Sequence, residues 1–93
     1  MGKLEQLKKQ LENDFVDAVN KMDKSIEEAK QVRQNEQFSW SYKQDTLKNI
    51  GADTQHYASK SCYICDLFAL LNDTSQDAEM ERLYNKYNLW REE

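Results

Sequence analysis

The pattern of apolar and polar positions is clearest in the first third of the chain. Three apolar positions recur every eleven residues, giving Leu4, Leu7 and Leu11, then Phe15, Ala18 and Met22, then Ile26 and Ala29. This spacing corresponds to about 3.67 residues per turn, so the stripe stays on one face of a nearly straight helix. On the charged face, Glu5 precedes Lys9 by four residues, which is the favourable order. The pattern predicts one helix over residues 3–33.

The segment RQNEQ at 33–37 has no apolar residue and predicts a turn. Ser39 or Ser41 can cap the helix that follows. Apolar residues then share one helical face as far as Ile50, and Gly51 comes directly after it. A helix that ends in a left-handed residue favours glycine there. We therefore expect a short helix over residues 39–50.

The next helix is expected over residues 54–72, with Asp53 or Thr54 as its cap. Its first turns are polar, but the run CYICDLFALL is interrupted only by Asp66. A helix that is apolar nearly all round is buried on several sides. A short apolar run can also be a buried strand, but no second strand is available to pair with it. The expected core residues are Cys62, Ile64, Cys65, Leu67, Phe68 and Leu71.

A loop is expected at 72–75, where the sequence is NDTS. Thr74 followed by Asp77 is a weak variant of the capping box. Apolar and aromatic residues at helical spacing then predict a last helix over residues 75–90. The fold class is therefore all-α: residues 1–93 form a single small helical bundle with a long first helix.

The predicted length of the first helix bears on assembly. A helix of 30 residues is about 45 Å long, whereas a compact domain of 93 residues is about 30 Å across. The first helix should overhang its domain unless the remainder stretches out beside it. The apolar share of 39% is also low for a globular domain. We therefore expect self-association, with a dimer favoured, through Leu4, Leu7, Leu11 and Phe15.

Charge is distributed unevenly along the chain. The net charge is −4; residues 1–65 carry ten acids and ten bases, and residues 66–93 carry seven acids and three bases. No cluster of Lys and Arg is present to bind phosphates, so direct nucleic-acid binding is not expected. No signal peptide and no run of about 18 apolar residues is visible. These features lead us to expect a soluble, cytoplasmic protein without membrane contact.

Cys62 and Cys65 form a C-x-x-C pair, which with His56 could serve metal or redox chemistry. A thioredoxin-type pair lies at a helix N-terminus after a strand, whereas this pair is expected in mid-helix. Structural zinc requires four ligands, and His56 is the only histidine. Buried cysteines that pack as small apolar residues are the more common arrangement. We therefore expect no metal, no cofactor and no enzymatic activity, with a metal or redox protein as an alternative.

The last predicted helix carries an aromatic face. Tyr and Trp are enriched where proteins bind one another, and Trp90 lies close to the C-terminus, where burial is hard to complete. Acidic residues share this segment. We expect a partner-binding surface that comprises Tyr84, Tyr87, Trp90, Asp77 and Glu81.

These expectations favour a non-catalytic protein–protein interaction module, an adaptor or inhibitor that binds a larger protein. Small acidic helical proteins of this kind are typical of phages and mobile elements, anti-defence inhibitors among them. In length and helicity the chain also resembles the WXG100-type secretion-associated proteins, which are helical hairpins. It departs from their W-x-G turn, because Ser41 and Tyr42 follow Trp40, and from their Tyr-x-x-x-acid signal, because Arg91 follows Tyr87 by four residues.

Overall fold

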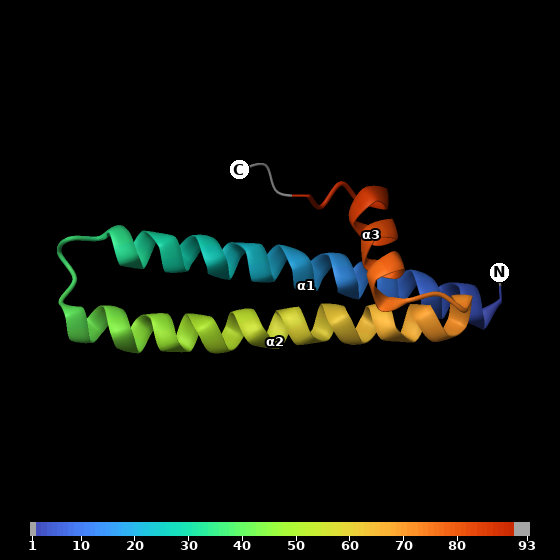
Figure 1. Cartoon of the computed structure of the whole chain (residues 1–93), viewed down its shortest axis with the longest axis horizontal. Coiled ribbons are helices and arrows are strands. Elements are labelled where there is room, and N and C mark those ends of the chain that lie inside the picture. Colours follow the sequence, from blue (N-terminus) through green and yellow to red (C-terminus); the bar gives the residue numbers. More distant parts are fainter. Residues whose placement is uncertain (1, 91–93) are drawn as a thin grey trace.

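The computed structural model describes residues 2–90, which form an elongated protein of three helices measuring 54 × 23 × 23 Å (Figure 1). The long helices α1 (Lys3–Gln34) and α2 (Trp40–Asn72) run antiparallel as a hairpin. The short helix α3 (Gln76–Lys86) packs near the end of the hairpin opposite its connecting loop. The all-helical class is confirmed. The expectation of four helices is wrong, because the two middle ones are a single helix.

The first helix and the turn after it agree with the sequence pattern. Helix α1 ends at Gln34, and the Gln37 amide donates to the Asn35 side chain at 2.9 Å in the turn. Ser39 caps α2, because its hydroxyl accepts the Tyr42 amide at 3.2 Å. The turn and this cap are therefore confirmed.

Helix α2 continues without a break through the position where the sequence predicted an end. Gly51 has no left-handed backbone angle, and Asp53 and Thr54 cap no helix. The Thr54 hydroxyl instead bonds the Ile50 carbonyl one turn back and the Ser25 hydroxyl of α1, at 2.9 and 2.6 Å. One glycine inside a helix costs only about 1 kcal/mol, which the packing of α2 against α1 outweighs.

The left-handed residues that do end helices are Asp73 and Asn88, with φ of 54° and 53°. Short polar side chains tolerate this conformation better than most residues. The Ser75 hydroxyl accepts the Ala78 amide at 3.1 Å and caps α3, so Thr74 is not the cap. Helix α3 ends at Lys86 rather than at residue 90, which corrects the predicted length of the last helix.

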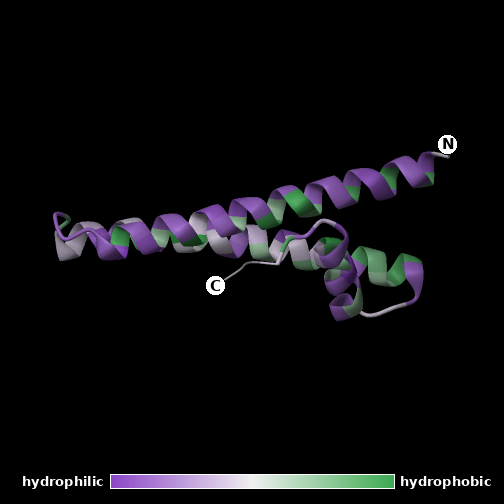
Figure 2. Cartoon of the chain, turned by 90° about the horizontal axis from the view of Figure 1, so that it is seen from above, coloured by the Kyte–Doolittle hydropathy of each residue, from purple (hydrophilic) through white to green (hydrophobic). Residues whose placement is uncertain are grey.

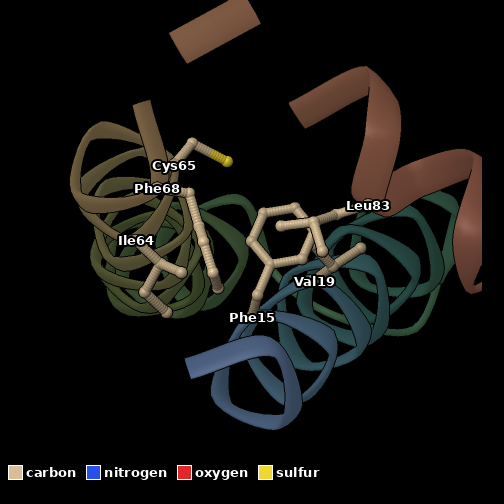
Figure 3. Close-up of a cluster of buried hydrophobic side chains, with 6 residues drawn as sticks. All are labelled: Phe15, Val19, Ile64, Cys65, Phe68 and Leu83. Atoms are coloured by element: carbon tan, nitrogen blue, oxygen red, sulfur yellow. The ribbon is translucent and has the colours of Figure 1, made fainter. Parts of the chain in front are cut away.

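The buried core joins all three helices in the half of the hairpin that lies away from its connecting loop (Figure 3). Phe15 of α1 and Phe68 of α2 are fully buried, and Leu83 of α3 closes the cluster. The cluster consists of Phe15, Val19, Ile64, Cys65, Phe68 and Leu83. Because α3 is short, this core occupies only one half of the hairpin.

The run CYICDLFALL is less buried than its composition suggests. Ile64, Cys65 and Phe68 lie in the core, and Cys62 and Leu67 are half-buried. The expectation that Leu71 belongs to the core is not met, because nearly half of its surface is exposed. The reason is geometric: α2 has only α1 and the short α3 beside it, so part of its circumference faces solvent.

Candidate interaction surfaces

A carboxylate of α1 holds α3 in place. Glu12 accepts a hydrogen bond from Lys86 Nζ at 2.8 Å and another from the Tyr87 hydroxyl. Arg82 Nη1 lies 3.5 Å from the second carboxylate oxygen. Glu12 is buried, so these contacts satisfy a charge that has little access to water. The sequence signal for this role is faint, because Glu12 merely borders the apolar stripe beside Leu11.

A second buried carboxylate joins α2 to α3. Glu79 accepts from Arg82 Nε at 2.9 Å, from Asn72 Nδ2 at 3.1 Å and from the Thr74 hydroxyl. Arg82 therefore lies between the two carboxylates, and its guanidinium also covers the Phe68 ring, 5.2 Å from its centroid. This network fixes the orientation of α3 on the hairpin.

Both carboxyl groups have a pKa below their ordinary value. Burial on its own would raise the pKa of Glu12, but hydrogen bonds from Lys86 and Tyr87 more than reverse this effect. Burial likewise opposes ionisation of Glu79, and hydrogen bonds from Thr74 and Arg82 bring its pKa below the ordinary value. In return, the hydrogen bond to Glu12 raises the pKa of Lys86. In this network the two carboxylates, Glu12 and Glu79, are paired with two cations, Arg82 and Lys86.

The first candidate surface is the open end of the hairpin, which we define as Leu4, Leu7 and Leu71. These residues extend the core stripes of α1 and α2 beyond the buried cluster, and 51% of Leu4 and 54% of Leu7 remain exposed. Figure 2 shows the first turns of α1 diverging from α2. The N-cap residue Gly2 has no side chain to cap α1. This end therefore presents apolar side chains that residues 2–90 leave about half exposed.

Two residues expected in the self-association surface, Phe15 and Leu11, pack in or against the core of the chain itself. Phe15 is fully buried and packs edge-on against Tyr84, with ring centroids 5.9 Å apart. Leu11 is half-buried against the core. Of the four residues proposed from the sequence, only Leu4 and Leu7 remain available to another molecule.

The predicted partner-binding surface at the C-terminal end likewise contains both half-buried and exposed residues. Tyr84 and Tyr87 are half-buried against the core, whereas Trp90 is more than half exposed. The Trp90 ring stacks at a tilt on Tyr84, with centroids 4.8 Å apart, and its indole donates to Asn85. Asp77 and Glu81 are exposed on α3. Trp90 is therefore the aromatic side chain of this set with a free face.

The sequence reasoning missed a second aromatic group at the loop end of the hairpin, which we call the aromatic tip and define as Phe38, Trp40 and Tyr42. Trp40 is 75% exposed, and the Phe38 and Tyr42 rings pack together with centroids 4.7 Å apart. Lys43 beside them donates to the Arg33 carbonyl at 3.1 Å. The signal was available in the sequence as three aromatic residues at alternate positions directly after a polar turn.

An open groove of about 300 Å³ lies between α1 and α2 in the loop half of the hairpin. No residue of its lining is buried, and its apolar members are half-buried on both helices. Gly51 lies in its wall with nothing within 4 Å of the place where a Cβ would be. We call this the loop groove and define it by Ile26, Ala29, Arg33, Leu47, Ile50, Gly51, Thr54, Gln55 and Ala58.

Cys62 and Cys65 are free thiols in the C-terminal half of α2. Burial, with further contributions from Cys62 and Glu79, raises the pKa of Cys65 to about 11. A thiol with so high a pKa is a poor nucleophile and a poor metal ligand at neutral pH. His56 is exposed and packs on Tyr57, with ring centroids 5.2 Å apart. Among residues 2–90, no three His, Cys, Asp or Glu side chains are grouped to hold a metal ion.

Comparisons with protein-family models, with curated proteins and with solved structures found no match for this chain. None of the helices in the described part of the chain has the length and apolar character needed to span a membrane.

Proposed function

We propose that the protein is a non-catalytic protein–protein interaction module that binds another protein through its open end and also associates with itself. The observation that carries the proposal is the exposure of Leu4, Leu7 and Leu71 on helix faces whose neighbouring turns form the core. Exposed apolar surface of this kind is costly for a small protein unless a partner covers it. An adaptor or inhibitor of a larger protein, of the sort that phages and mobile elements encode, has these properties.

The charge distribution supports a protein partner. Lys3, Lys8 and Lys9 surround the leucines of α1, and Glu5 is the one acid among residues 2–10. An apolar stripe bordered by lysines favours a partner whose apolar groove has an acidic rim. Helix-in-groove binding of this kind uses anchors spaced three and four residues apart, as Leu4, Leu7 and Leu11 are.

The test is affinity capture with a matched pair of variants. Tagged protein is incubated with lysate of the source organism, and the captured proteins are quantified by mass spectrometry. The double substitution Leu4→Glu and Leu7→Glu should lose the specific partner. Asn13→Glu and Asn20→Glu place the same charge on exposed positions of the same helix and should keep it. Equal capture by both double variants would contradict binding at the open end.

A second candidate is a secretion-associated helical hairpin resembling the WXG100-type proteins. The observation that favours it is the antiparallel pairing of α1 and α2, with exposed Trp40 beside the turn that joins them. Immunodetection in culture supernatant tests this candidate, with a cytosolic enzyme as the control for lysis. Confinement of the protein to the cell pellet would exclude it.

A further inference from the structure

Within residues 2–90, α3 forms a third layer over one half of the hairpin, and no third helix covers the loop half. Between residues 21 and 58, all of which the structure describes, the one buried side chain is the polar Ser25. Its hydroxyl lies 2.6 Å from that of Thr54, which holds α1 and α2 together there. An apolar stripe normally needs a second layer to cover it. This half of the hairpin is therefore open on the side where α3 would lie if it were longer.

The loop groove lies on the face that α3 covers further along. Gly51, Ala58 and Cys65 follow one another at intervals of seven residues on α2, so they share one helical face. Cys65 is buried in the core with Leu83 of α3, whereas Gly51 and Ala58 line the open groove. The groove is thus the uncovered continuation of the surface on which α3 packs.

We propose that a second copy of this chain occupies the loop groove, antiparallel to the first, about a two-fold axis near Ala29. This inference rests on the proposed self-association and deepens it, because it assigns that contact to the loop half and leaves the open end for a different partner. The two loop halves then cover one another as four helices. An antiparallel arrangement also keeps the two α3 helices at opposite ends, where they do not collide.

The axial register brings the aromatic tip of one copy toward the exposed Trp90 of the other. The contact between Ser25 and Thr54 places Trp40 about ten residues beyond Ala29 along the hairpin, or about 15 Å. The two-fold axis reverses this direction for the second copy. Its Trp40 therefore lies about 15 Å from Ala29 toward the N-terminus of α1 in the first copy, at the level of Val19. Val19 lies in the core beneath α3. Trp90 stacks on Tyr84, which packs on Phe15 one helical turn from Val19, so the aromatic tip of one copy lies near Trp90 of the other.

The buried area agrees with this arrangement. The overlap is about 30 Å long and two helices wide, on the order of 600 Å² from each copy, which is near the lower limit for a specific dimer. We expect a dissociation constant in the micromolar range.

Sedimentation equilibrium between about 1 and 100 µM tests the proposal, since a micromolar constant populates both states in this range. The wild-type chain should change from monomer to dimer. Gly51→Glu should remain a monomer without loss of helical circular dichroism, because the helix gains from losing glycine and the site is open. Ala52→Glu, one residue further on an exposed position outside the groove, is the matched control and should dimerise.

Trp40 reports the predicted register directly. In Trp90→Phe it is the sole tryptophan, and its emission should move to shorter wavelength as the protein dimerises, but not in the variant that also carries Gly51→Glu. A wild-type chain that is monomeric throughout the range would overturn the inference. So would a dimer that survives Gly51→Glu but is lost with Leu4→Glu and Leu7→Glu, which would place self-association at the open end. Capture of a different protein by the open end is a separate measurement, and its result tests the proposed partner binding without bearing on the dimer.

Discussion

Glu12 and Lys86 lie 74 residues apart in the sequence and 2.8 Å apart in the structure. This pair, with the Tyr87 hydroxyl on the same carboxylate oxygen, ties the last helix to the first. The backbone of α3 runs close to α2 rather than to α1, so side chains connect α1 with α3: the Glu12 carboxylate supplies the polar contacts, and Phe15 packs against Leu83 and Tyr84. The position of α3, and with it the extent of the covered surface, depends on this carboxylate.

Glu12→Gln should therefore destabilise the protein although the two side chains have nearly the same shape. The amide removes the charge that Lys86 and Arg82 face and presents a donor where an acceptor is needed. The expected cost is about 1–3 kcal/mol in the free energy of unfolding, measured by urea denaturation. Glu5→Gln, which alters an exposed pair with Lys8, is the control and should change stability by less than about 0.5 kcal/mol.

Stability should fall in acid as Glu12 and Glu79 become protonated. Each has a folded-state pKa below the ordinary value of 4.5, so each stabilises the fold above that pH and loses this contribution as the pH falls through the lowered pKa. Thermal unfolding followed between pH 7 and pH 3 should show a declining midpoint below about pH 4.5. Glu12→Gln should flatten the decline, and an unchanged slope in this variant would argue against the role of Glu12.

Phe68 and Leu70 are large apolar residues of the same segment of α2, but only Phe68 is buried. Phe68 is buried against α1 and α3, whereas Leu70 is 82% exposed. Phe68→Ala should cost about 3–5 kcal/mol, enough to unfold much of so small a domain, while Leu70→Ala should lie within about 0.5 kcal/mol of wild type. Urea denaturation measures both. Similar losses from the two variants would mean that α2 is buried on both sides.

Gly51→Ala distinguishes a continuous α2 from two helices joined at residue 51. In a continuous helix with open space around the site, alanine should stabilise the protein by about 0.5–1 kcal/mol. At a left-handed helix end it would destabilise it instead. The urea midpoint should be compared at a concentration at which sedimentation shows monomers, so that any change in self-association does not contribute.

The thiol of Cys65 should react slowly with a disulfide reagent under native conditions. It is fully buried and has a pKa of about 11, so at pH 8 only about one molecule in a thousand carries the thiolate. Native protein should therefore show one readily titrated thiol, the half-buried Cys62, and a second that appears on addition of urea. Cys62→Ala should abolish the rapid phase; if both thiols of the wild type react rapidly, the core around Cys65 is open.

The sequence by itself determined the elements whose signals are local. The stripe from Leu4 to Ala29 specified α1 because helical periodicity is a property of consecutive residues, and the polar segment before Ser39 specified the turn because no apolar face can continue through it. The loop before α3 followed from capping residues in the same way. These features need no information about distant parts of the chain.

Only the tertiary structure decided where helices continue and which faces are covered. Gly51 carried a local signal for a helix end, but the packing of α2 along α1 outweighs a penalty of about 1 kcal/mol. Leu71 is as apolar as Ile64, yet it is exposed because it lies at the end of α2, where the first turns of α1 diverge from it. Glu12 and Glu79 are buried because their partners come from other helices. Burial depends on residues that are distant in the sequence, and no periodicity within one helix encodes it.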